Sequence, residues 1–164
     1  MTSPVEIATL AGGCFGGMED LLRKIPGVKE TTVGYTGGQT ENPTYNDVKT
    51  GTTGHAEAIQ VKFDPITVSY ETLLLFFFRM HDPTTLNRQG NDLGSQYRSE
   101  IFFHSPEQES TAKRVKDDVE KRGKWKRPIV TKISPAVKFT SAENYHQDYL
   151  LKNPGGYTCH FLRD

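Results

Sequence analysis

The chain has 164 residues with 20 basic and 20 acidic side chains, which is enough for one domain with a sizeable apolar core. Its balanced charge gives no broad field for nucleic acid, and no apolar run is long enough to span a bilayer. The N-terminus has no basic segment followed by an apolar core, so we expect one cytoplasmic domain over residues 1–164, with no nucleic-acid or membrane partner.

The first predicted elements are a strand over residues 5–10 and a helix over residues 15–25, joined by Gly12-Gly13-Cys14-Phe15-Gly16-Gly17. The helix is supported by apolar residues at helical spacing: Phe15, Met18, Leu22 and Ile25. The four glycines allow a sharp turn that delivers Cys14 to the first turn of the helix. Unpaired N–H groups and the helix dipole there favour a thiolate, so the sequence predicts a reactive cysteine.

Two other interpretations of Cys14 are open from residue type. A cysteine at a strand end is often a small buried hydrophobic residue. A phosphate-binding glycine loop fits less well, because position 14 would have to be glycine and no Gly-Lys-Ser/Thr sequence follows. The strand–glycine–cysteine–helix context favours a nucleophile, although this stretch alone does not name a reaction.

The middle of the chain contributes a candidate acid. A strand is predicted over residues 28–35, followed by a polar loop over residues 39–54 that is long enough to be functional. In the next predicted strand, residues 57–63, alternation places Glu57 on the apolar face. If that face is the core, burial raises the pKa of Glu57 and makes it a proton donor near neutral pH. The alternative is a frayed strand end with Glu57 in water.

The second half contains further helices and strands. Ser69 is predicted to cap a central helix that runs to Met80, and the polar loop over residues 84–98 is either a connector or a binding loop. The remaining predicted elements are a strand over residues 100–103, a helix beginning at Ser105-Pro106, a strand over residues 128–133 and a short helix capped by Ser141. This order contains the split β-α-β pair of ferredoxin-like domains. We therefore predict an α+β two-layer sandwich.

Residues 153–164 are predicted to form a flexible tail, because glycines precede Cys159 within it. Cys14 and Cys159 are the two cysteines of the sequence, and neither lies in a C-x-x-C pair or a metal-binding spacing. A structural disulfide is one interpretation. A transient redox pair fits a cytosolic protein better, because persistent disulfides are rare there.

Five blocks, in this order, together resemble peptide methionine sulfoxide reductases of the A class, which act on the S-sulfoxide epimer. They are the glycine turn around Cys14, Asn42-Pro43-Thr44-Tyr45, Gly54-His55-Ala56-Glu57-Ala58, Gly94-Ser95-Gln96-Tyr97-Arg98-Ser99 and Gly155-Gly156-Tyr157-Thr158-Cys159-His160-Phe161. The resemblance runs from about residue 7 to residue 163. It implies an α/β roll with the split β-α-β core.

The resemblance also implies roles for individual residues. Cys14 would attack the sulfoxide sulfur, Glu57 would protonate the departing oxygen, and Cys159 would resolve the resulting sulfenic acid. The polar pocket would be completed by Tyr45, Tyr97 and Asp92. Thioredoxin or a similar dithiol protein would reduce the Cys14–Cys159 disulfide, and neither a metal nor an organic cofactor would be needed.

One position departs from the family pattern Gly-Cys-Phe-Trp-Gly. The resemblance implies that Phe15 is one wall of a pocket for the S-methyl group, but the tryptophan of the second wall is replaced by Gly16. We expect this change to affect substrate affinity more than chemistry.

Two functions of other classes remain open from the residues themselves. Cys14 and Cys159 could form the disulfide of a non-catalytic redox sensor, which would need neither Glu57 nor the tyrosines. A cysteine acyl-transfer enzyme would instead need His55 or His160 as a base within reach of Cys14.

Overall fold

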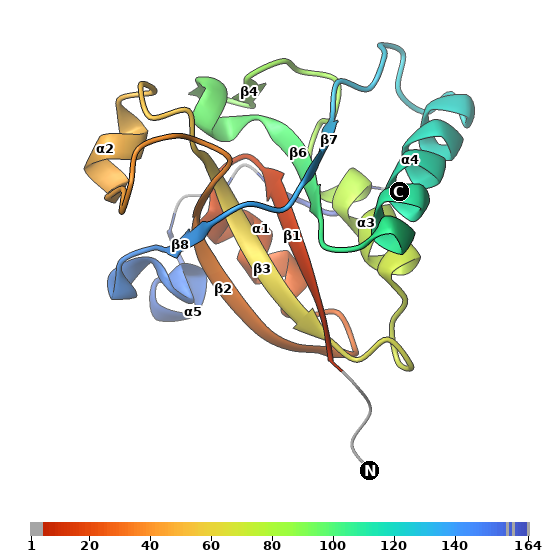
Figure 1. Ribbon diagram of the computed structural model, residues 1–164, viewed down its shortest axis with the longest axis horizontal. Helices are drawn as coiled ribbons and strands as arrows, with labels where there is room; N and C mark the ends of the chain where they lie inside the picture. The colour runs from red at the N-terminus through yellow and green to blue at the C-terminus, as the bar shows by residue number, and fades with distance from the viewer. Residues whose placement is uncertain (1–4, 157, 159, 164) are drawn as a thin grey trace.

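The computed structural model describes residues 5–156, 158 and 160–163. A six-stranded sheet with the order β7-β6-β1-β3-β2-β8 forms its centre (Figure 1). Its strands are β1 (Glu6–Gly12), β2 (Val28–Thr36), β3 (Ala56–Phe63), β6 (Ser99–Phe103), β7 (Lys132–Pro135) and β8 (Phe139–Ser141). Neighbouring strands are antiparallel except β6 and β7, which run parallel, so the sheet is mixed.

Five helices accompany the sheet in the described part of the chain: α1 (Phe15–Leu22), α2 (Tyr45–Lys49), α3 (Tyr70–Met80), α4 (Pro106–Lys121) and α5 (Tyr149–Lys152). In Figure 1, α1 lies behind β1, β3 and β2, while α3 and α4 pack side by side at one edge. The predicted α+β class is therefore confirmed. None of the helices in residues 5–156 is both long and apolar enough to cross a lipid bilayer.

The two faces of the sheet bury different cores. The face toward α1 and α3 carries the main apolar core, which includes Leu10, Val33 and Ile59. The other face has small side chains such as Ala11 and Ala58, with Phe102 among them. The connection from β7 to β8 crosses this second face, as Figure 1 shows. Small residues are needed there because the connection packs directly on the strands.

Several predicted boundaries shift in the structure. The first helix ends at Leu22 rather than Ile25, because the last amides bond three residues back in tight turns. The strand predicted over residues 128–133 lies at 132–135, where it pairs with β6. Ser141 does not cap a helix: it ends β8, where it pairs with Gly34. The following helix, α5, begins at Tyr149.

Both long polar loops contain local structure that was not predicted. Residues 39–54 include α2, which starts with a reciprocal capping box between Thr44 and Asp47. Residues 84–98 include the hairpin strands β4 (Arg88–Gln89) and β5 (Asp92–Leu93) and the 3-10 turn η1 (Ser95–Tyr97). These short elements fix the loop backbones beside the start of α1.

Candidate active site

Cys14 is the N-cap residue of α1 and follows directly on the turn that ends β1. The turn requires glycine at position 13, where φ is +103° and a Cβ atom would lie 2.7 Å from Cγ of Gln89. The Cys14 thiol is half-buried and is not in a disulfide. Local backbone geometry thus places the cysteine at the helix start, as predicted.

The thiol is not, however, an activated thiolate in this structure. Backbone N–H groups of Gly16 and Gly17 bond to the sulfur and lower its pKa, which is the predicted effect of the helix start. Burial, followed by the neighbouring Glu57 carboxylate, outweighs them and raises the pKa of Cys14 to about 12. The expectation of a thiolate at rest is wrong, because the low polarity of the pocket was not visible in the local sequence.

Glu57 lies at the start of β3 with only 2% of its surface exposed, so the frayed-end alternative is excluded. Its Oε1 accepts a hydrogen bond from the backbone N–H of Phe15 at 3.2 Å, one residue after Cys14. Burial raises the pKa of Glu57 to about 8, and the charge of Asp92 adds to this effect. The carboxyl group is therefore mainly protonated at neutral pH, as the burial argument predicted.

Three further predicted residues come from the two long loops. Tyr45 begins α2, Asp92 lies in β5 and Tyr97 ends η1. The pKa values of both phenols are raised, first by burial and next by the charge of Glu57. Cys14 and Asp92 also contribute to both shifts. The structure therefore brings five ionisable groups into one electrostatic cluster: Cys14, Tyr45, Glu57, Asp92 and Tyr97.

Phe15 and Gly16 follow Cys14 directly at the start of α1. The Phe15 ring is buried and packs against the rings of Tyr35 and His146, at centroid distances of 5.8 and 5.3 Å. At Gly16, a Cβ atom would meet only ordinary contacts, the nearest at 3.5 Å from Cδ1 of Tyr149. A larger side chain at position 16 would thus begin without strain beside Tyr149.

The C-terminal tail docks behind the cysteine turn. Cys159 lies outside the described residues, but its neighbours on both sides are placed. Thr158 and His160 lie so close to Gly17 that a Cβ atom there would clash with both side chains. Nε2 of His160 donates to the carbonyl of Gly12 at 2.7 Å, which ties the tail to the end of β1.

The model of the family described as "Peptide methionine sulfoxide reductase" matches residues 6–163. The chain belongs to the peptide methionine sulfoxide reductase family. A relative from Methanoculleus marisnigri, named peptide methionine sulfoxide reductase MsrA, is 57% identical over 152 residues, covering 93% of each chain.

Solved structures of Mxr1 from Saccharomyces cerevisiae are similar as well. The reduced form has a TM-score of 0.92 at 40% identity and covers 98% of this chain and 93% of its own. Mxr1 in complex with Trx2 has a TM-score of 0.67 at 27% identity, with 100% of this chain and 96% of that chain covered.

In this reductase, two site residues were not predicted from sequence. Glu143 accepts hydrogen bonds from the Tyr35 hydroxyl at 2.8 Å and from the backbone N–H of Tyr45 at 3.0 Å. Burial alone would raise the pKa of Glu143, but these donors hold it below its usual value. His146 packs its ring 4.4 Å from that of Tyr45. Both contacts join segments about a hundred residues apart, so no local pattern could have indicated them.

The histidines required by an acyl-transfer mechanism have structural roles in this reductase. His55 accepts the N–H of Gly38 through Nδ1 and bonds the carbonyl of Thr40 at 2.7 Å through Nε2. Nε2 of His160 is hydrogen-bonded to the carbonyl of Gly12, and burial lowers the pKa of His160 to about 4. Among the described residues, no group of three or more His, Cys, Asp or Glu side chains is arranged to hold a metal ion.

Proposed function

We propose that this chain reduces methionine S-sulfoxide, free or within proteins, to methionine, with Cys14 as the nucleophile and Glu57 as the acid. The single observation that supports this most is the buried, largely protonated Glu57 held against the backbone of the residue after Cys14. A carboxylic acid beside a cysteine at a helix start suits a reaction in which an oxygen must be protonated while a sulfur is attacked.

The proposed first step transfers oxygen from substrate to enzyme. The Cys14 sulfur bonds to the sulfoxide sulfur, Glu57 gives its proton to the sulfoxide oxygen, and the thiol proton returns to Glu57. In the resulting adduct the hydroxyl group passes from the substrate sulfur to the Cys14 sulfur, as the substrate S–O bond and the new S–S bond both break. The balance is thiol plus sulfoxide to sulfenic acid plus thioether, so Cys14 is oxidised and methionine is released.

In this mechanism the remaining site residues orient the substrate. Tyr45 and Tyr97 keep their hydroxyl protons because their pKa values are raised, so both can donate hydrogen bonds to the sulfoxide oxygen. Asp92 adds a polar wall, while Phe15 and the space beside Gly16 receive the S-methyl group. Glu143 holds Tyr45 in place through the backbone N–H at the start of α2.

Regeneration is assigned to Cys159 and an external dithiol. The thiol of Cys159 condenses with the Cys14 sulfenic acid, forming a disulfide and releasing water. Thiol–disulfide exchange with thioredoxin then restores both thiols. The docked positions of Thr158 and His160 and the Mxr1–Trx2 complex support this assignment. We propose that residues 1–164 form one domain in which the tail over residues 153–164 moves to bring Cys159 to Cys14. The protein would work in a reducing compartment such as the cytoplasm, where thioredoxin can reduce the disulfide.

The strand order β6-β1-β3-β2, with antiparallel neighbours, supports the finer description of the fold that we propose: a ferredoxin-like split β-α-β core, extended by β7 and β8. Cys14 and Glu57 then lie at one end of its two central strands.

The test is methionine release from resolved sulfoxide epimers without any reductant. We expect about one methionine per chain from the S epimer, loss of both free thiols, and no product from the R epimer. A redox sensor or an acyl-transfer enzyme would release none. With Cys159→Ser the first turnover should persist while cycling with thioredoxin stops; normal cycling would contradict the resolving role.

A further inference from the structure

We propose that His160 is a positioning residue for the resolving step: it holds the tail against the Cys14 turn, so that Cys159 reaches the Cys14 sulfenic acid faster than it would from an unanchored tail. This inference rests on the proposed function, because it concerns the step that follows methionine release. In that step the Cys159 thiol gives up its proton, the sulfenic acid gives up its hydroxyl group, the two leave as water, and the S–S bond forms.

The imidazole of His160 is buried against the turn that carries Cys14, with only 7% of the residue exposed. Its Nε2 lies 2.7 Å from the carbonyl oxygen of Gly12, and since a carbonyl can only accept, Nε2 carries the hydrogen. Nδ1 of the same ring lies against Gly17 in the first turn of α1. Both ring nitrogens therefore face residues within three positions of Cys14 in the sequence.

Thr158 strengthens the same contact from the other side of Cys159 in the sequence. Its Oγ1 accepts the backbone N–H of His160 at 3.1 Å, so the two residues that flank Cys159 are bonded to each other. Oγ1 of Thr158 also lies against Gly17. Both neighbours of Cys159 thus contact the helical turn that begins at the nucleophile.

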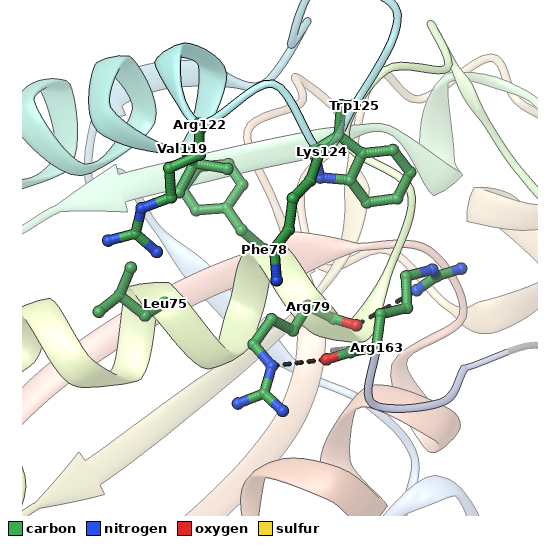
Figure 2. Close-up of a pocket in the computed structure, with 8 residues that line it drawn as sticks. All are labelled: Leu75, Phe78, Arg79, Val119, Arg122, Lys124, Trp125 and Arg163. Carbon is green, nitrogen blue, oxygen red and sulfur yellow. Dashed lines mark hydrogen bonds between the residues drawn. The ribbon is translucent and has the colours of Figure 1, made fainter.

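A second anchor holds the chain beyond His160. Figure 2 shows hydrogen bonds between Arg79 of α3 and Arg163: Nε of Arg79 donates to the carbonyl of Arg163 at 2.6 Å, and the N–H of Arg163 donates to the carbonyl of Arg79 at 2.9 Å. This anchor lies four residues after Cys159, whereas His160 follows Cys159 directly. His160 therefore restricts the resolving cysteine more closely than the second anchor does.

The redox state of the structure is the one in which such positioning matters. Cys14 is a free thiol, so the docked tail is that of the enzyme before the disulfide forms. A tethered group reacts at an effective concentration set by the length and stiffness of its tether. Holding it near its target before the reaction also lowers the entropy cost of the step. With His160 docked, only a short movement of the chain is left for Cys159 to make.

The test is a single turnover without reductant, with His160→Ala and His160→Gln in the full chain. Methionine formation reports the first step, loss of the second free thiol reports disulfide formation, and dimedone captures the sulfenic acid between them. For His160→Ala we expect methionine formation at the wild-type rate, disulfide formation slowed about tenfold, and more dimedone adduct. Glutamine also carries an N–H donor at its end, so His160→Gln should recover most of the wild-type rate of disulfide formation.

A second variant displaces the tail without changing His160. Gly17 is helical, so its backbone admits alanine, but a Cβ atom there would collide with the side chains of His160 and Thr158. Gly17→Ala should therefore slow disulfide formation relative to methionine formation in the same variant. Gly155→Ala is the matched control, because a Cβ atom at this tail position has nothing within 4 Å, and it should leave that ratio unchanged.

An unchanged rate of disulfide formation in His160→Ala would overturn the positioning role. A faster rate would overturn it too, because His160 would then hold Cys159 back. Equal slowing in His160→Gln or in Gly155→Ala would also contradict it. Failure of the wild type to form methionine would instead contradict the proposed function, and normal thioredoxin cycling by Cys159→Ser would contradict the resolving role, so the claims fail separately.

Discussion

The site contains two carboxyl groups, those of Glu57 at the start of β3 and Glu143 in the segment between β8 and α5. The two regions that hold them shift their pKa values in opposite directions. The sheet end buries Glu57 almost completely and offers it one backbone N–H, that of Phe15, so its pKa rises to about 8. The β8–α5 segment leaves Glu143 partly exposed and surrounds it with donors from Tyr35 and Tyr45, so its pKa falls.

This difference shows how one site can hold an acid and an anchor of the same chemical type. Desolvation penalises the charged form, whereas hydrogen bonds from N–H and O–H groups stabilise it. With burial dominant, Glu57 keeps a proton that it can give to a substrate. With hydrogen bonding dominant, Glu143 stays charged and fixes the start of α2. The two assignments therefore imply different responses of Glu57 and Glu143 to substitution and to pH.

The largest expected effect is on catalysis by Glu57→Gln. Glutamine keeps the shape and can accept the Phe15 N–H, but it cannot supply a proton, so kcat should fall about 100-fold or more. The measurement is steady-state reduction of a methionine sulfoxide peptide. A fall below about threefold would assign the proton to another group, with Tyr45 and Tyr97 the next candidates.

The two carboxylates should have opposite effects on stability as pH changes. For Glu57, the folded state retains a proton that the unfolded chain loses above about pH 4.5, so its burial costs stability increasingly until about pH 8. Glu57→Gln should therefore raise Tm at about pH 9 by roughly 10 °C or more and change it less at about pH 5.

The contribution of Glu143 to folding stability depends on pH in the opposite way. Because its pKa is lowered in the folded state, the charged carboxylate stabilises the fold at neutral pH, and this stabilisation is lost as pH falls through the acid range. Glu143→Gln should thus lower Tm at neutral pH and have a smaller effect in acid. Thermal unfolding of both variants across this range measures the comparison directly, and the same sign for both would refute it.

A smaller effect is expected on catalysis by Glu143→Gln. Weaker hydrogen bonds to Tyr35 and to the Tyr45 backbone should loosen the phenol of Tyr45, lowering kcat/KM about tenfold. The pH at which activity declines on the alkaline side should stay that of the wild type, because Glu57 is untouched. A shift in the pH of this alkaline decline would show that Glu143 takes part in the proton transfer.

The smallest effect is expected from Gly16→Trp, which alters neither carboxylate. The backbone at position 16 admits a side chain, and the added ring should cover the S-methyl group, lowering KM by a factor between about 3 and 10. Replacing a helical glycine should also stabilise the fold by up to about 1 kcal/mol. An unchanged or raised KM would mean that Tyr149 already covers this side of the pocket.

Local patterns predicted the parts of the site that depend on neighbouring residues. The glycine turn placed Cys14 at the helix start, and strand alternation placed Glu57 on the buried face, because both follow from backbone geometry. The resemblance supplied Tyr45, Tyr97 and Asp92, which the structure brings together from two loops.

The features that were missed depend on contacts between distant segments. Strand β8 forms only by pairing with β2, and Glu143 reaches Tyr45 across 98 residues. The pKa of Cys14 was predicted in the wrong direction for a similar reason. The helix start acts locally, but burial and the Glu57 carboxylate come from tertiary packing.

The central claim is that Glu57 is protonated at neutral pH and gives its proton during the first turnover. Infrared difference spectroscopy between the wild type and Glu57→Gln, titrated from about pH 3 to pH 10, observes this group directly. We predict a carboxylic-acid C=O band that is lost with a midpoint near pH 8 in the wild type and is absent from the variant. A band that disappears near pH 4.5, the ordinary value for glutamate, would contradict the account.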